Sequence, residues 1–132
     1  MTNIILIRHG QSEWNSKNQF TGWVDARLSN KGKLEAKLAG TLIKNLNIKI
    51  SNSYTSYLKR AKNTLEIILN QISSNKILIN EAWELNERHY GSLTGLNKTE
   101  TKINLGEDIF KNYRRSWDKA PPPIDKNSIY LK

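Results

Sequence analysis

The chain begins with a short apolar run that changes character abruptly. Residues 3–7 read "NIILI", and a continuous run of branched apolar side chains is typical of a strand that is buried on both faces. Arg8, His9 and Gly10 follow at once. Because ligands of open α/β sheets gather outside the carboxyl ends of the strands, this pattern predicts either a site that holds an anion or a loop that is merely polar.

Two segments with helical spacing of apolar residues alternate with two further strand-like segments. Ser29 can cap a helix that begins near Asn30, and its apolar face is expected to consist of Leu34, Leu38, Ala39, Leu42, Ile43 and Leu46. Gly40 lies inside this helix and weakens the prediction. A second helix is expected from Leu58, Ala61, Leu65, Ile68, Leu69 and Ile72. Strands are expected at residues 48–55 and 76–80. Helices between strands favour βαβ units and a parallel sheet.

The second half of the chain is more polar. Residues 86–98 contain Gly91 and Gly95 among many polar side chains, which predicts a long loop. Two short helical segments, broken near Gly106, are expected next. Three consecutive prolines at positions 121–123 then end regular structure. The tryptophans are expected in the core or at the bases of loops, and they stand at positions 14, 23, 83 and 117.

Length and composition predict one cytoplasmic domain that spans residues 1–132. A chain of 132 residues is long enough for a real core. The sequence contains no cysteine, which excludes a disulfide framework and a thiolate metal site. The N-terminus lacks the pattern of a secretory signal, and no apolar run approaches membrane-spanning length. We therefore expect no membrane partner.

The charge of the chain raises the question of a nucleic-acid partner. The formal net charge is +9, and basic surfaces attract polyanions. However, 15 of the 21 cationic residues are lysines that are scattered along the chain. Asn, Lys and Ile make up 46 of the 132 residues, and their A/T-rich codons explain the lysine content without a polyanionic partner. No patch of interleaved aromatic and basic residues accompanies the charge, so we expect no nucleic-acid binding.

The residues after the first predicted strand suit attack on phosphorus. Imidazole is a nucleophile only when neutral, and the cation of Arg8 beside His9 favours the neutral form. The guanidinium of Arg8 also offers a fork of donors to phosphate oxygens, and Gly10 allows the backbone to approach a ligand. Arg60 begins the second predicted helix, and parallel strands place that junction at the same edge of the sheet. The alternative for Arg60 is an ordinary solvated helix residue.

Five stretches spread over nearly the whole chain together resemble one family. They are "LIRHGQSEWN", "NQFTGWVDARLSNKG", "YTSYLKRAKNTL", "LNERHYGSLTGLNK", and "NYRRSW" followed by "APPP". They resemble the 2,3-bisphosphoglycerate-dependent phosphoglycerate mutases of the histidine phosphatase superfamily. The resemblance implies an α/β fold, a phosphoglycerate mutase-like three-layer sandwich with a mostly parallel sheet.

The resemblance also implies roles for individual residues. His9 would be the nucleophile that becomes phosphohistidine, and Arg8 and Arg60 would clamp the transferring phosphoryl group. Glu87 would be the general acid and base, and the alternative for this residue is an ordinary loop salt bridge. Substrate binding is implied for Ser12, Asn15, Thr21, Gly22, Arg88, His89, Tyr90, Lys98, Arg114 and Arg115. The bland alternative for the last two is a solvated helix face. The cofactor would be 2,3-bisphosphoglycerate, the ligands small phosphorylated three-carbon acids, and no metal is implied.

The sequence departs from the family at its C-terminal end. The family's chains run further and carry a second histidine in a His-Gly-Asn segment, whereas the histidines here are His9 and His89. The resemblance therefore implies a C-terminally truncated fold whose sheet lacks its last strands. We expect exposed apolar flanks at Ile4, Ile5 and Ile7, unpaired strand edges, and little or no mutase activity. Family members are often dimers or tetramers, which leaves a homo-oligomer open.

Three functions stay open from the sequence. The first is the mutase, an isomerase acting in glycolysis and gluconeogenesis. The second is a phosphatase of the same superfamily, in which water replaces the substrate hydroxyl. The third is a non-functional gene remnant, and the DNA downstream of codon 132 would separate it from the others.

Overall fold

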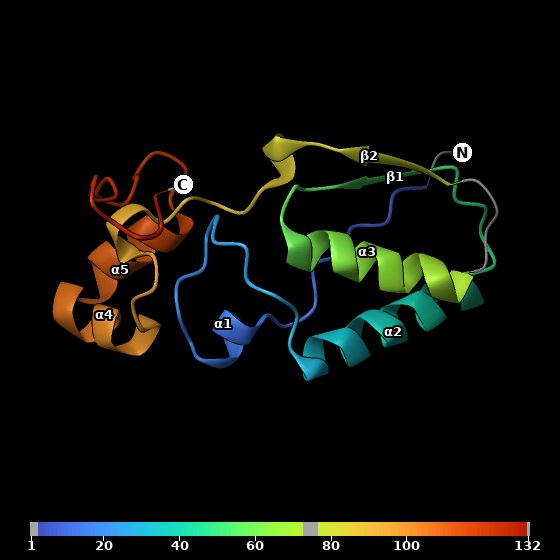
Figure 1. Ribbon diagram of the computed structural model, residues 1–132, viewed down its shortest axis with the longest axis horizontal. Coiled ribbons are helices and arrows are strands. Elements are labelled where there is room, and N and C mark those ends of the chain that lie inside the picture. The colour runs from blue at the N-terminus through green and yellow to red at the C-terminus, as the bar shows by residue number, and fades with distance from the viewer. Residues whose placement is uncertain (1–2, 73–76, 132) are drawn as a thin grey trace.

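The computed structural model describes residues 3–72 and 77–131. It contains two strands, five α-helices and two short 3-10 helices within these residues (Figure 1). The elements follow in the order α1 Glu13–Ser16, α2 Asn30–Asn45, β1 Asn52–Thr55, α3 Lys59–Ile72, β2 Leu78–Glu81, η1 Trp83–Leu85, η2 Gly91–Leu93, α4 Lys98–Leu105 and α5 Glu107–Arg115.

The two strands pair in parallel, as the sequence predicts. Asn52 lies opposite Leu78, and Thr55 lies opposite Glu81. α3 connects the two strands and forms the helix of a βαβ unit. β1 is shorter than the predicted segment of residues 48–55, and the predicted start of the next strand, Lys76, lies outside the described residues.

α2 packs against α3 through its small residues and not through its leucines. Gly32, Ala36, Gly40 and Ile43 are buried, and a Cβ atom on Gly40 would meet side-chain carbons of Gln71 at 2.8 Å. The predicted apolar face is therefore mostly wrong. More than half of the surface is exposed in each of Leu34, Leu38, Leu42 and Leu46. The leucines and the small residues each recur every four positions, so they form two separate rows along α2. The row of small residues faces α3 because it allows the two helices to approach more closely than leucines would.

The N-terminal apolar run is not a buried strand. Among residues 3–72 and 77–131, no strand pairs with residues 3–7. Ile4 is 80% exposed and Leu6 is 91% exposed. A strand needs a neighbour that satisfies its backbone groups, and none is provided here. The expectation of exposed flanks is confirmed, because Ile4, Ile5 and Ile7 are all open to solvent.

The buried aromatic side chains gather in the other half of the molecule. Phe20, Tyr90, Leu93 and Phe110 form a buried cluster, which we call the aromatic cluster. The ring centroids of Phe20 and Tyr90 lie 4.9 Å apart, and those of Phe20 and Phe110 lie 5.9 Å apart. α4 and α5 are separated by Gly106, whose φ of 79° is a left-handed conformation, so the predicted break between two short helices is confirmed.

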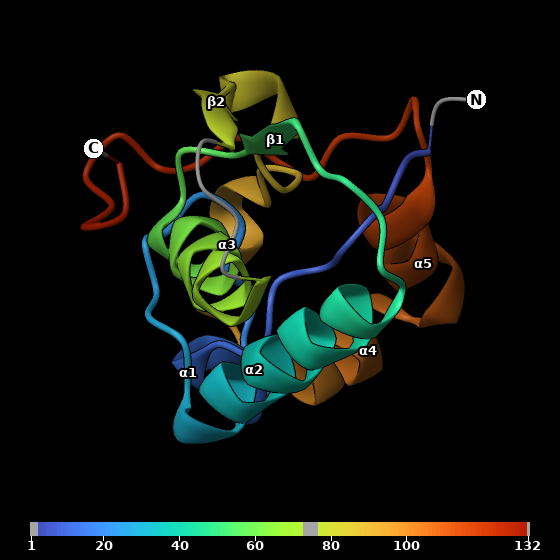
Figure 2. The same ribbon diagram turned by 90° about the vertical axis from the view of Figure 1, so that its right-hand side faces the viewer.

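Figures 1 and 2 show the two halves in space: β1 and β2 lie over α3 and α2, while α4 and α5 lie to the other side. In the described part of the chain, both long helices lie on the same side of the sheet (Figure 2). These residues therefore form two of the three layers that the resemblance implies. The tryptophan prediction is wrong for Trp83 and Trp117, which are 57% and 94% exposed. None of the described helices combines the length and the apolar character needed to cross a membrane.

Candidate active site

The backbone at His9 and Gly10 packs between α2 and α3. The Gly10 N–H donates to Oγ1 of Thr64, on α3, at 3.1 Å. On the opposite side, a Cβ atom on Gly10 would overlap the carbonyl oxygen of Gly32, in the first turn of α2. Glycine is therefore required at position 10 for a close approach of two backbones. These contacts fix the backbone beside the His9 imidazole.

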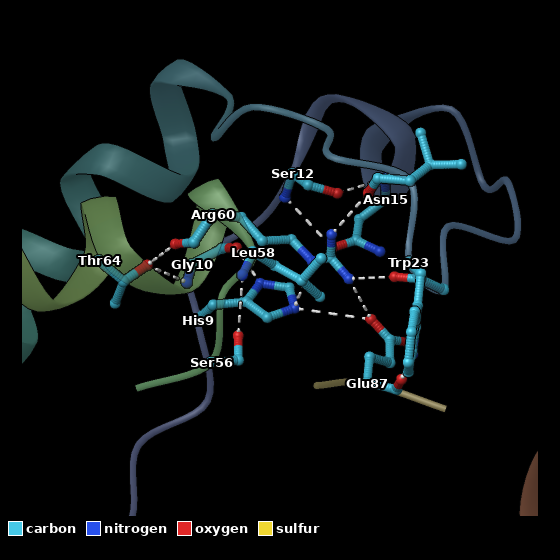
Figure 3. Close-up of polar contacts among 12 residues, drawn as sticks. His9, Gly10, Ser12, Asn15, Trp23, Ser56, Leu58, Arg60, Thr64 and Glu87 are labelled. Atoms are coloured by element: carbon cyan, nitrogen blue, oxygen red, sulfur yellow. Dashed lines mark hydrogen bonds and ion pairs between the residues drawn. The ribbon is translucent and has the colours of Figure 1, made fainter. Parts of the chain in front are cut away.

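The contacts of His9 select one tautomer of its ring. Nδ1 lies 2.7 Å from the carbonyl oxygen of Gly10, and a carbonyl oxygen only accepts, so Nδ1 carries the proton. Nε2 lies 3.2 Å from Nε of Arg60, and a guanidinium only donates, so Nε2 accepts. The lone pair of the neutral ring is thus on Nε2, which faces the centre of the site (Figure 3). A neutral imidazole in this tautomer is suited to nucleophilic attack.

Arg60 is the central residue of the site. Its side chain is 0% exposed, so the alternative of a solvated helix residue is wrong. Beside His9, the guanidinium donates to the carbonyl oxygens of Val24 at 2.9 Å and Gly22 at 2.6 Å. It also donates to the Glu87 carboxylate at 2.9 Å. Arg60 thereby joins α3, the loop at residues 20–24 and the loop that carries Glu87.

Glu87 points into this cluster. One of its carboxylate oxygens lies 3.9 Å from Nε2 of His9 (Figure 3). Burial raises the pKa of this carboxyl, but the neighbouring imidazole of His9 and the charge and hydrogen bond of Arg60 outweigh that effect, and the pKa lies below its usual value. The carboxylate is therefore ionised and able to accept a proton. The indole N–H of Trp23 donates to the Glu87 carbonyl at 2.7 Å and fixes the backbone.

The predicted ligand residues between positions 12 and 22 lie in the segment that contains α1 and the loop after it. Ser12 and Asn15 form a reciprocal cap on α1: the Ser12 hydroxyl accepts from the Asn15 N–H at 3.1 Å, and the Asn15 side chain accepts from the Ser12 N–H at 3.2 Å. Thr21 is buried, and its hydroxyl has no hydrogen-bond partner among the described residues. Gly22 has a φ of +52° and packs against the backbone of Tyr90.

Three further predicted residues converge on the aromatic cluster. The ammonium of Lys98 lies 5.9 Å from the ring centroid of Phe20, and the guanidinium of Arg114 lies 5.2 Å from that of Phe110. Burial and the charge of Arg114 lower the pKa of Lys98, the charge of Glu87 opposes them, and the charge of Arg8 adds a smaller lowering effect. Burial and the charge of Glu87 raise the pKa of the Tyr90 hydroxyl, against the opposing charges of the nearby arginines. Lys98, Arg114 and Glu87 therefore share one electrostatic environment.

The remaining predicted residues lie outside the group of contacts formed by His9, Arg60 and Glu87. Arg8 and Arg115 are exposed. His89 is exposed too, its Nδ1 accepts from the Gly91 N–H at 3.0 Å, and its ring meets that of Trp23 edge to face at 5.7 Å. Arg88 donates to backbone carbonyls at the end of α5.

The arrangement fits a small polyanion. Within residues 3–72 and 77–131, neither Lys98 nor Arg114 forms a salt bridge with a carboxylate. Nε of Arg114 and the hydroxyl of Thr21 are buried without hydrogen-bond partners in the same residues. These are cations and donors that a ligand with two anionic groups would satisfy. No group of three His, Cys, Asp or Glu side chains in the described part could hold a metal ion.

Sequence reasoning missed two supporting residues. Thr64 accepts from the Gly10 N–H and donates to the Arg60 carbonyl at 2.7 Å, so it links the loop that carries His9 to α3. Its signal was its position four residues after Arg60, which places both on one helix face. Trp23 holds the backbone of Glu87, 64 residues away, and no local pattern indicates such a contact.

Residues 4–129 match the histidine phosphatase superfamily (branch 1). The chain belongs to this superfamily. The match covers the His9 loop, Arg60, Glu87 and both arginines at the end of α5. The resemblance drawn from the sequence motifs is thereby confirmed.

The curated relatives to which the chain is similar include proteins named as phosphoglycerate mutases. The 2,3-bisphosphoglycerate-dependent phosphoglycerate mutase of Pelagibacter ubique is 52% identical over 130 residues, covering 98% of this chain and 54% of the relative. Phosphoglycerate mutase 1 of Saccharomyces cerevisiae is 52% identical over 130 residues, with coverages of 98% and 53%. The chain spans about half the length of the curated relatives it matches.

Several solved structures align with this chain over about half of their own length. A mycobacterial hydrolase, 22% identical, aligns with a TM-score of 0.70 and covers 86% of this chain and 50% of its own. YhfR of Bacillus stearothermophilus, 28% identical, aligns with a TM-score of 0.68 over 80% of this chain and 50% of its own. A phosphoserine phosphatase of Entamoeba histolytica in complex with 3-phosphoglyceric acid is 27% identical, with a TM-score of 0.62 and coverages of 90% and 54%. The predicted α/β fold class is confirmed as part of a histidine phosphatase domain.

Proposed function

We propose that this chain carries the phosphoryl-transfer centre of a 2,3-bisphosphoglycerate-dependent phosphoglycerate mutase. That reaction interconverts 2-phosphoglycerate and 3-phosphoglycerate through a phosphohistidine at His9. The observation that carries the proposal is the geometry of Nε2 of His9, which accepts from the buried Arg60 and lies 3.9 Å from the Glu87 carboxylate. The 52% identity to proteins named as mutases supports the same reaction.

The residues divide the chemistry in the following way. Nε2 of His9 forms the bond to phosphorus while the P–O bond to the donor breaks. Arg60 compensates the charge on the equatorial oxygens. Glu87 takes the proton from the attacking substrate hydroxyl in the return step and supplies one to the leaving oxygen in the forward step. A phosphate dianion near Glu87 raises the pKa of this carboxyl by repulsion, which enables it to hold that proton.

The second group of cations favours a mutase over a phosphatase. Lys98 and Arg114 rest on the rings of the aromatic cluster without carboxylate partners among the described residues. A carboxylate and a second phosphate would satisfy them and orient the phosphoglycerate for transfer in both directions. A hydrolase needs only the phosphate pocket. Tyr90, Ser12, Asn15, Thr21 and Gly22 would complete the walls of this ligand space.

The proposal also covers the cofactor, the binding partners and the cellular location of the protein. The primer of His9 would be 2,3-bisphosphoglycerate, with no metal requirement. The partners would be small phosphorylated three-carbon acids, not nucleic acid or a membrane, and the location would be the cytoplasm. A homo-oligomer stays open.

Labelling with [32P]2,3-bisphosphoglycerate tests the proposal. We expect an acid-labile adduct that is lost in His9→Asn and retained in His89→Asn, the matched control at the other histidine. An adduct that survives in His9→Asn, or no adduct in the unmodified chain, would refute it.

Product analysis separates the two enzyme classes. We expect label to move between 2- and 3-phosphoglycerate, whereas release of inorganic phosphate as the main product would assign a phosphatase. Turnover should fall short of that of a full-length relative by about a hundredfold or more. No second imidazole lies against His9 in the described residues, and one missing charge-stabilising group typically has that effect.

A further inference from the structure

Arg88 does not point its guanidinium at the cluster around His9. Its Nη1 donates to the carbonyl oxygen of Tyr113 at 3.0 Å and to that of Lys119 at 3.4 Å. Its Nη2 donates to the carbonyl oxygen of Ser116. All three acceptors belong to the last turn of α5 and the segment that follows it.

These contacts complete the C-terminal end of α5. The last carbonyls of a helix have no partner within it and carry the negative end of the helix dipole. Here the Asn112 carbonyl accepts from the Ser116 N–H at 2.9 Å, and the Tyr113 carbonyl depends on Arg88. The same turn carries Arg114 and Arg115. The position of these two cations is therefore tied to residue 88.

The backbone of Arg88 is fixed from the other side. Glu87, the preceding residue, is held at its carbonyl by Trp23 and at its carboxylate by Arg60. The Arg88 carbonyl lies against Gly22, where a Cβ atom would come within 3.2 Å. One residue thus links the acid–base group to the end of the helix that carries the arginine pair.

We propose that Arg88 is a positioning residue that holds the end of α5, with Arg114 and Arg115, at a fixed distance from Glu87. This inference rests on the proposed function for its consequence but not for its geometry. It differs from the sequence expectation, in which Arg88 binds substrate directly. The clamp acts on the part of the ligand that reaches the arginine pair and leaves the phosphate pocket at His9 unaltered.

Two ligands of different reach separate positioning from a general loss of structure. Inorganic phosphate needs only the pocket of His9 and Arg60, whereas 3-phosphoglycerate needs that pocket and the end of α5. In Arg88→Gln we expect the Kd for 3-phosphoglycerate to rise by about tenfold, while that for phosphate changes less than about twofold. Ile68→Val is the matched control, because it removes one buried methyl group between α2 and α3. It should change neither Kd. Equal weakening of both ligands in Arg88→Gln would overturn the inference.

The conservative variant distinguishes a clamp from a direct contact. An ammonium cannot span the carbonyls that the planar guanidinium reaches, so Arg88→Lys should behave like Arg88→Gln. Recovery of 3-phosphoglycerate affinity in Arg88→Lys would show that only the charge matters and would overturn the clamp.

Hydrogen–deuterium exchange tests the clamp without any ligand. We expect amides of residues 113–119 to exchange faster in Arg88→Gln than in the unmodified chain, and amides of α2 to remain unchanged. Unchanged exchange at residues 113–119 would overturn the inference. Faster exchange there in a chain that binds neither ligand would support the clamp and refute the proposed function, so the two failures are distinguishable.

Discussion

The two halves of the molecule differ in how their apolar side chains are arranged. Around the aromatic cluster, Phe20 is 0% exposed and Phe110 is 7% exposed. Around the sheet, Ile4, Leu6 and the four leucines of α2 face solvent. The difference teaches that the half with α4 and α5 has a buried aromatic centre in the described residues, although Ile103 and Trp117 at its surface are exposed. In the sheet half, the exposed apolar side chains belong to one continuous run and one helix face that nothing described here covers.

The candidate active site lies on the border between these halves. His9 and Arg60 come from the sheet half, and Glu87 comes from the segment that leads to the aromatic cluster. Arg60 crosses the border with hydrogen bonds to both sides. The site therefore has more contacts that hold it in place than residues 3–7, which precede it and pair with no strand among the described residues.

The largest effect is expected when the connection across the border is removed. Arg60→Ala would leave the Gly22 and Val24 carbonyls and the Glu87 carboxylate without their donor. We expect the free energy of unfolding, measured by urea titration with circular dichroism, to fall by about 3–5 kcal/mol. The adjacent Lys59→Ala, at an exposed ion pair with Asp25, should lower it by no more than about 1 kcal/mol. Similar losses in both variants would contradict the central role of Arg60.

A pair of substitutions compares the halves directly. Phe110→Ala removes a buried ring from the aromatic cluster and should lower the free energy of unfolding by about 3 kcal/mol. Leu38→Ala removes an exposed side chain from α2 and should change it by about 0.5 kcal/mol or less. Urea titrations of both variants under one buffer condition test the contrast. A larger loss for Leu38→Ala would show that the leucine face is covered in solution.

Two threonines on the long helices provide a finer comparison. Thr64→Val leaves the buried Gly10 N–H without its acceptor and should lower the free energy of unfolding by about 1–2 kcal/mol. Thr41→Val is the control, because its hydroxyl also donates to the carbonyl four residues earlier but lies at an exposed position. Thermal melts should place the midpoint of the Thr64 variant well below that of the Thr41 variant. Coincident melts would refute a buried hydrogen bond at Gly10.

The smallest effect concerns the pH dependence of stability. The pKa of Glu87 lies below its ordinary value of 4.5 in the folded chain. The unfolded chain then binds the proton more tightly. The stabilisation is therefore fully present above about pH 4.5 and is lost as the pH falls through the lower, folded pKa. Urea titrations between pH 3 and pH 7 should show a shallower acid loss in Glu87→Gln, and an unchanged slope would contradict the ion pair with Arg60.

The meeting of His9 and Arg60 was predicted from the sequence, although the reason given, two neighbouring ends of parallel strands, holds only for Arg60, because residues 3–7 pair with no strand among the described residues. The Arg8–His9–Gly10 stretch and Arg60 each come after a predicted strand, and the structure brings His9 and Arg60 into contact. The side of α2 that is buried could not be predicted, because leucines and small residues recur at the same spacing. Hydropathy favours the leucines, while close packing with α3 favours Gly32, Ala36 and Gly40. Residues 3–7 were misjudged for a related reason: an apolar run indicates a strand only when another strand lies beside it.

Roles that depend on distant partners were beyond the sequence. Arg88 lies in a motif that suggests ligand binding, yet its guanidinium meets carbonyls 25 to 31 residues later. Ser12 and Asn15 have the spacing of a helix cap, which indicates their local contact, but not the cluster that they border. Such contacts require the path of the chain between the partners, which no local pattern specifies.

The direct contact between the backbones at positions 10 and 32 has a mechanical consequence. With no side chain between them, the loop that bears the imidazole and the first turn of α2 cannot slide independently. A partner that bound the exposed leucines of α2 and displaced this helix would therefore move the loop that carries His9 with it.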